Sequence, residues 1–336
     1  MLFRYRNKDN NPPRRAALSD EALGLARATD DDLCLAHVLR LRAMALRTPD
    51  HLEECLEATT ELLGLSGLPP PLVAGARLLR ADSLVILGRI PEAVTELDLV
   101  EPLAKQLRSQ LLGAQLNWAR AGMLRLAGSW SQADALSRAT FDLHAPTRRY
   151  TALATRAAQR WETAFMTGTG ADLVDELRAA TEVTGVSGLP NVLAMALVEA
   201  DRIEDARVAL HHLEPRTKDY TWLYTRCWAL LAASRLGDTA LVTSLRGQLL
   251  PYRRLACAAS ANVVSGSVAY FTAEAALTLG DPEAALADLA IAVEIDQAMG
   301  ALPWLARARD AITRAQQLRQ GGHLSRSTRA ARPGRS

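Results

Sequence analysis

The chain repeats a turn every forty residues. Turns interrupt stretches of helical apolar spacing at Thr48, Gly88, Gly128 and Gly168, and each turn lies forty residues after the one before. A helix-turn-helix unit of about this length cannot bury its apolar face alone, because only a neighbouring unit covers it. The spacing therefore predicts a stack of helical hairpins that acts through its surface.

The sequence between the turns shows how the units are built. The first hairpin is expected over residues 31–47 and 49–63, with Pro49 in the first turn of its second helix. Residues 16–28 resemble the second helix of a preceding unit, so the stack is expected to begin in the middle of a unit. Later turns follow at spacings of 33, 36 and 43 residues, at Asp201, Gly237 and Gly280. The predicted fold is an all-α, right-handed tetratricopeptide-like superhelix, an α-solenoid of about seven hairpins.

Composition agrees with a helix-rich protein of the cytoplasm. Of 336 residues, 49% are hydrophobic and only 5% aromatic, and 39 basic residues nearly balance 37 acidic ones. No apolar run reaches the length of a membrane span, and the first residues lack the apolar core of a signal peptide. We therefore expect a cytoplasmic protein that makes no membrane contact.

No residue pattern predicts a metal or a cofactor. The four cysteines never form a Cys-x-x-Cys pair, so buried reduced thiols are expected. Cys34 with His37 and His51 with Cys55 share helical faces, but around a turn at Thr48 the two pairs miss each other by roughly 10 Å along the helix axis.

Signs of catalysis are also missing from the sequence. No Gly-x-x-x-x-Gly-Lys-Ser/Thr occurs, so the loop that cradles nucleotide phosphates is missing. Ser265-Gly266-Ser267 does not fit the nucleophile turn, and no strand is expected before it, so a helix start or close packing is the favoured interpretation. We expect a protein that is not an enzyme. An enzyme with an unrecognised pocket inside the superhelix is the second alternative, and a buried carboxylate or histidine with a strongly shifted pKa in a cleft would favour it.

An arginine precedes each regular turn by eight residues, at Arg40, Arg80, Arg120 and Arg160. Stacking would place these arginines at equivalent positions on successive first helices, which line the concave face in tetratricopeptide folds. Four like charges about 10 Å apart repel one another weakly, so acidic groups should offset them. Two interpretations stay open: ion pairs with neighbouring helices, or binding of an acidic peptide, a phosphate-bearing ligand or the acidic face of a partner domain on the concave face.

Other residues would extend that predicted concave face. His37, Arg77 and Asn117 stand eleven residues before their turns and would add one helical turn to it. Four aromatic residues could anchor a peptide there: Trp118, Trp161, Tyr224 and Trp228.

Short motifs in the turns and near the C-terminal end carry a family resemblance. Leu87-Gly88-Arg89-x-x-Glu92-Ala93 and Leu279-Gly280-Asp281-Pro282-Glu283-Ala284 resemble tetratricopeptide turns. Together with Gly266-Ser267-Val268-Ala269-Tyr270 and Gly300-Ala301-Leu302-Pro303-Trp304, they resemble the C-terminal region of large bacterial signal-transduction ATPases. These are transcriptional regulators with a maltose-regulator-like helical arm, as in LuxR-type and antibiotic-regulator-type activators. Where that family tends to carry a Gly-rich run, this chain has Ala256–Asn262.

The resemblance implies an arm without its motor or its DNA reader. Residues 1–318 are expected to form the repeat domain and residues 319–336 a disordered basic tail, for which weak nucleic-acid contact is an alternative. The expected function is a non-enzymatic arm for protein interaction or regulatory sensing, whose partner is an ATPase or DNA-binding regulator encoded nearby. The first alternative is a transcriptional regulator that contacts DNA directly through its basic residues.

Overall fold

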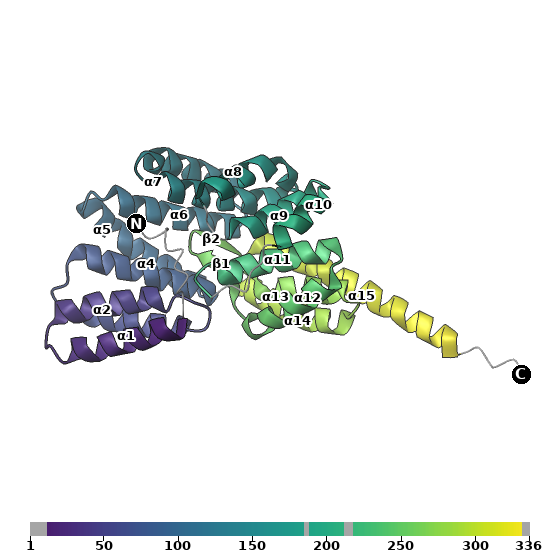
Figure 1. Cartoon of the computed structure of the whole chain (residues 1–336), viewed down its shortest axis with the longest axis horizontal. Coiled ribbons are helices and arrows are strands. Elements are labelled where there is room, and N and C mark those ends of the chain that lie inside the picture. The colour runs from purple at the N-terminus through teal and green to yellow at the C-terminus, as the bar shows by residue number, and fades with distance from the viewer. Residues whose placement is uncertain (1–11, 185–187, 212–217, 331–336) are drawn as a thin grey trace, which may run out of the picture.

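The chain folds into a solenoid of paired antiparallel helices (Figure 1). A computed structural model describes residues 12–184, 188–211 and 218–330. The N-terminal helices are α1 (Pro12–Arg27), α2 (Asp32–Ala45), α3 (Leu52–Gly64), α4 (Pro70–Ile86), α5 (Ile90–Gln106), α6 (Gln110–Leu126) and α7 (Trp130–Thr167). The later helices are α8 (Val174–Thr184), α9 (Leu189–Glu199), α10 (Ile203–His211), α11 (Trp222–Leu236), α12 (Thr239–Leu249), α13 (Val268–Thr278), α14 (Pro282–Ala298) and α15 (Leu302–Ala330). Short 3-10 turns lie at Gly170–Leu173 and Leu250–Tyr252.

The repeat predicted from the sequence is confirmed. Gly88, Gly128 and Gly168 end first helices in the left-handed backbone region, with φ of 75°, 85° and 74°, where a side chain would be strained. Helix α7 contributes to two hairpins, because Arg148, just after Pro146, leaves the helical backbone region and bends it. Helices α2 to α14 thus form seven hairpins, with α1 before them and α15 after them.

A β-hairpin in the middle of the solenoid was not predicted. Strands β1 (Ala256–Ser260) and β2 (Val263–Ser267) pair antiparallel and lie between the N-terminal and C-terminal halves (Figure 1). The expectation that no strand precedes Ser265 is therefore wrong, because β2 contains this residue. The favoured role of close packing is observed, since a Cβ on Gly266 would lie 2.7 Å from Cγ of Trp304.

The two halves share one hydrophobic core, which includes the hairpin. A single cluster of buried apolar residues runs from Leu52 on α3 to Ala315 on α15 and contains Ala256, Cys257 and Val264 of the strands. Aromatic rings fill its centre around Trp228, which lies 4.7 Å from the Phe165 ring. A smaller separate cluster joins α2, α3 and the start of α4.

Polar contacts on the rim also join the two halves. Lys218 Nζ lies 2.8 Å from Oδ2 of Asp50, which is in the turn between α2 and α3, and Lys218 also bonds Tyr252. Arg47 forms an ion pair with Asp82 at 2.8 Å and stacks 4.5 Å above the Tyr220 ring. The solenoid is therefore closed on itself around the hairpin.

Helix α15 extends out of the folded body toward the C-terminus (Figure 1). It is helical to Ala330, so the helix continues past the boundary expected at residue 318. Across the described ranges, we find no helix with the length and apolar character needed to span a membrane.

Candidate functional site

The concave face of the solenoid is occupied by the chain's own β-hairpin. Asp82 on α4 accepts a hydrogen bond from the backbone N–H of Ala261 at 2.8 Å. On α6, Gly122 lies so close to the hairpin that an added Cβ would be 2.3 Å from the Ala261 carbonyl oxygen. On α7, the Glu162 carboxylate accepts from Ser265 Oγ at 2.9 and 3.0 Å. The first helices of three consecutive helical hairpins thus each supply one contact to the β-hairpin.

These three contact positions share the forty-residue spacing. Asp82, Gly122 and Glu162 are each forty residues apart, so they are equivalent positions of successive units. We call them the inner row. The inner row thus offers two carboxylates with a glycine between them. This arrangement accommodates an extended segment with small side chains, and the β-hairpin is such a segment.

Gln159 adds a fourth contact one helical turn before Glu162. Its Nε2 donates to the carbonyl oxygens of Trp118 at 2.9 Å and Asn262 at 2.8 Å, and its Oε1 accepts from Ser137 at 2.7 Å. The hairpin turn is therefore bonded through its backbone, which suits recognition of an extended chain whatever its side chains are.

Two buried carboxyl groups hold strand β2. Glu162 is only 3% exposed, and burial raises its pKa to about 7 although hydrogen bonds from Tyr224 and Ser265 lower it. Asp296 on α14 accepts from the N–H of Ser267 at 2.7 Å, and burial raises its pKa to about 7 as well. A shifted carboxylate was the feature expected to favour an enzyme, but Glu162 is covered by the hairpin and engaged by this chain's own groups.

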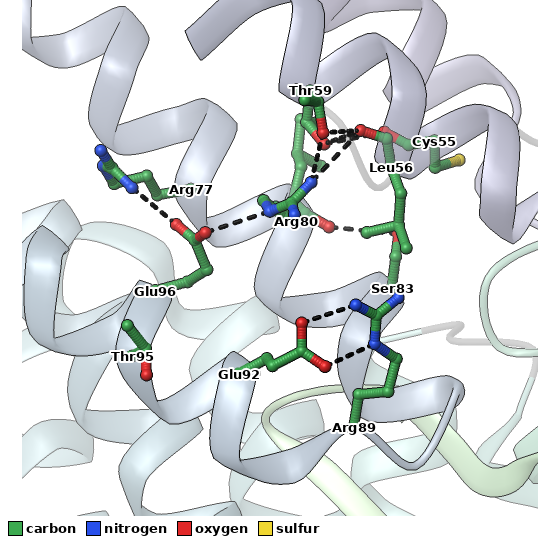
Figure 2. A network of polar contacts seen from close by, with 12 residues as sticks. Cys55, Leu56, Thr59, Arg77, Arg80, Ser83, Arg89, Glu92, Thr95 and Glu96 are labelled. Atoms are coloured by element: carbon green, nitrogen blue, oxygen red, sulfur yellow. Dashed lines mark hydrogen bonds and ion pairs between the residues drawn. The ribbon is translucent and has the colours of Figure 1, made fainter.

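The arginine series lies on the other side of the first helices. Arg80 on α4 contacts the second helices: its Nε lies 3.0 Å from the Glu96 carboxylate on α5 (Figure 2). Its Nη1 lies 2.6 Å from the Thr60 hydroxyl on α3. Arg77 shares the same carboxylate at 2.8 Å. The expectation that these arginines line the concave face is wrong, because two residues along a helix turn the side chain by about 200°, so the inner row faces the groove and the arginines face outward.

The remaining arginines of the series behave similarly. Arg120 pairs with Glu101 at 2.6 Å and with Asp98 at 3.1 Å on α5, and Arg160 pairs with Glu176 on α8. Arg40 packs against Gly75 on α4, and its buried Nε has no hydrogen-bond partner among the described residues. Ion pairing within the chain thus accounts for three of the four, and contact of this series with a partner stays a prediction.

The aromatic residues expected to anchor a peptide are buried. Trp118 packs edge-on against His144 at 5.0 Å, while Trp161 and Tyr224 surround Trp228 at 5.2 and 6.1 Å. Their side chains belong to the core and not to a partner surface of this structure. Asn117 is half-buried on α6.

The sequence contains the spacing of the inner row, but the residue types of its members hide it. Its spacing equals that of the arginines, and it is offset by only two residues, but Asp, Gly and Glu share no chemistry that marks them as one series. Within the described ranges, no group of His, Cys, Asp or Glu side chains could hold a metal ion.

Comparisons with known proteins give no family for this chain. No family model and no curated protein sequence matches it. Among solved structures, the crystal structure of the P58(IPK) TPR domain is similar over 93% of this chain and 99% of that chain, at 16% sequence identity and a TM-score of 0.26. Whole chains at that score do not superpose closely, so the tetratricopeptide-like architecture rests on the hairpins and turns described above.

Proposed function

We propose that the chain is a non-enzymatic arm for protein interaction or regulatory sensing, which docks a partner on its N-terminal end face. This end face is formed by exposed leucines of the first two helices. They are Leu18 (55% exposed) and Leu25 (65%) on α1, and Leu33 (44%) and Leu41 (56%) on α2. Leu18 and Leu25 are seven residues apart and therefore share a face of α1, as Leu33 and Leu41 do on α2.

A comparison with the later repeats shows that the position of Leu41 is normally covered by another helix. Residues forty, eighty and one hundred and twenty positions after Leu41 are Ala81, Ala121 and Trp161, and each is buried. Later first helices are covered at this position inside the stack, whereas Leu41 on α2 is 56% exposed although α1 packs beside this helix. The vacant place is that of one more first helix, so the end face fits an amphipathic helix with a leucine-sized apolar stripe.

The occupied groove supports a function in binding and not in bond making. The hairpin fills the concave face, and the buried carboxylates that face it are engaged by Tyr224, Ser265 and the Ser267 backbone. A partner must therefore use the outer surfaces of the solenoid, of which the end face has exposed apolar side chains.

The family resemblance supports a particular partner. In signal-transduction ATPases the helical arm follows the ATPase, which places the ATPase at the N-terminal end of the arm. We therefore propose, as the partner, a cytoplasmic ATPase or DNA-binding regulator encoded beside this chain, which docks with a helix on α1 and α2.

Binding of purified chain to that neighbouring gene product tests the proposal. Leu25→Glu and Leu41→Glu should each weaken binding at least about tenfold, because a fully buried leucine contributes about 1.5–3 kcal/mol. The matched control is Leu143→Glu, a similarly exposed leucine on α7. Isothermal titration calorimetry gives the affinities, and circular dichroism checks that all three variants keep their helices.

The outcomes are distinct. Loss of binding in the two end-face variants with normal binding in the control supports the proposal. Equal affinities for all variants place the partner elsewhere and refute it. Concentration-dependent dimers of the chain alone that Leu41→Glu abolishes would assign the end face to a second copy, which also refutes it.

A further inference from the structure

A small pocket that is open to solvent lies at the surface where three helices of the C-terminal half meet. It has a volume of about 240 Å³ and is lined by Arg235 on α11, Tyr270 on α13 and three residues of α15, namely Arg307, Asp310 and Arg314. The pocket is therefore large enough to admit a small molecule from solvent.

Two of the arginines are held in place by the protein. Arg307 donates from Nη2 to the Phe165 carbonyl oxygen at 2.9 Å, and its guanidinium lies 4.1 Å from the centre of the Phe165 ring. Arg314 bonds both carboxylate oxygens of Glu274, with Nη1 at 3.1 Å from one of them. Arg314 is thereby neutralised, while Arg307 keeps its full charge beside the buried Tyr270.

Arg235 and Asp310 complete the pocket at its exposed rim. Within the described ranges, neither Arg235 nor Arg307 has a carboxylate at ion-pair distance, and Asp310 has no cation at that distance. Glu199 lies near both arginines, but it is half-buried beside the Gly170 backbone and forms no ion pair with either. The pocket thus presents two guanidinium groups that form no direct ion pair, and the Asp310 carboxylate, whose electrostatic partner is Arg314 on the same helix.

The geometry points to a binding site for a small phosphate monoester that also carries hydroxyl groups. Guanidinium groups present parallel N–H donors that match phosphate oxygens, and two of them suit a dianion better than a single carboxylate. Asp310 would repel an ion that is only anionic, but its oxygens can accept from a hydroxyl group of the same ligand. This site is independent of the docking surface proposed above.

Calorimetric titration of the full chain with inorganic phosphate, glycerol 3-phosphate and glycerol tests the site. We expect glycerol 3-phosphate to bind more tightly than phosphate, and glycerol alone not to bind. Arg235→Gln should weaken glycerol 3-phosphate at least about tenfold, because it removes a charge-assisted contact. Arg309→Gln, an exposed arginine on the same helix outside the pocket, is the matched control and should leave the affinity unchanged.

Asp310→Asn separates the two halves of the proposal. Removal of the carboxylate should strengthen inorganic phosphate binding, because it removes a repulsive charge, and should reduce the advantage of glycerol 3-phosphate over phosphate. Equal affinity of wild type and Arg235→Gln for glycerol 3-phosphate would overturn the site. An equal loss of glycerol 3-phosphate affinity in Arg309→Gln would also overturn the site, because it would show that the ligand responds only to the general positive charge of the helix.

Discussion

At the scale of single residues, Glu162 links the hairpin to pH. Burial raises its pKa to about 7 from the ordinary value of 4.5. Between these two pH values the folded chain holds a proton that the unfolded chain has released, so the free energy of unfolding falls as pH rises from 4.5 to 7 and is level above.

Glu162→Gln should remove this decline, because glutamine keeps an acceptor for Tyr224 and Ser265 and cannot ionise. Between pH 4.5 and 7, the free energy of unfolding of the wild type should fall by on the order of 2–3 kcal/mol relative to that of the variant. Urea denaturation at four pH values between 4.5 and 7.5 measures the difference between the two proteins, in which the contribution of Asp296 cancels. Parallel pH profiles would contradict the prediction.

Residue type decides which of the two forty-residue series can be recognised from the sequence. The arginine series was visible because one residue type recurs, and its distance from the turns was correct. Its orientation depended on which side of the first helix faces the groove, and that is set by how the units stack. The inner row was invisible for the opposite reason: its members share a position but no chemistry.

At the scale of elements, the contact between α6 and the hairpin depends on a missing side chain. Gly122→Ala would place a methyl group against the Ala261 carbonyl oxygen, a backbone atom that cannot rotate away. We expect a loss of about 1–3 kcal/mol in the free energy of unfolding, as for other overpacked interiors. Gly113→Ala is the matched control in the same helix, because nothing lies within 4 Å of its added Cβ.

The control should change stability in the opposite direction. Alanine is favoured over glycine inside a helix by roughly 0.5–1 kcal/mol, so Gly113→Ala should be neutral or more stable. Chemical denaturation measures the free energy of unfolding of both variants and of the wild type. Destabilisation of the two variants by the same amount would show a general effect of substitution in α6 and not a contact with the hairpin.

The helices could be predicted from the sequence, whereas the β-hairpin could not. Apolar spacing and Gly turns are local signals, and the structure confirms the helical hairpins that they predicted. Residues 256–267 are mostly small and lack the polar and apolar alternation of a half-exposed strand. The strands are buried on both faces, so partners such as Asp82, 179 positions away from Ala261 in the sequence, supply the context that makes them strands.

At the scale of the whole molecule, closure around the hairpin changes how the solenoid unfolds. Repeat proteins ordinarily make contacts between adjacent units only, so their ends can unfold separately. Here Asp82 joins the fourth helix to the tip of the β-hairpin, and Asp50 joins the turn between α2 and α3 to Lys218, 168 residues later. We expect tryptophan fluorescence and far-ultraviolet circular dichroism to report one common transition.

Asp82→Ala should divide that transition. The change leaves the Ala261 N–H and Arg47 without their acceptor, at a cost of roughly 2–3 kcal/mol, and it weakens the link between the two halves. The fluorescence and dichroism midpoints should then separate. Glu92→Ala removes an ion pair within one turn, with Arg89, and should leave the midpoints coincident (Figure 2). Coincident midpoints in both variants would show that the hairpin does not couple the halves.

The position of the hairpin near the end of the chain has a consequence for synthesis. Helices α4, α6 and α7 leave the ribosome long before residues 256–267, so Asp82 and Glu162 must wait in an open groove for their partners. The N-terminal units can form their helices one after another, but they cannot seal their interior in that order. Until the hairpin emerges, the nascent protein exposes a furrow that recognises extended backbone, and this is the interval in which it is most open to a chaperone or to another unfinished copy of itself.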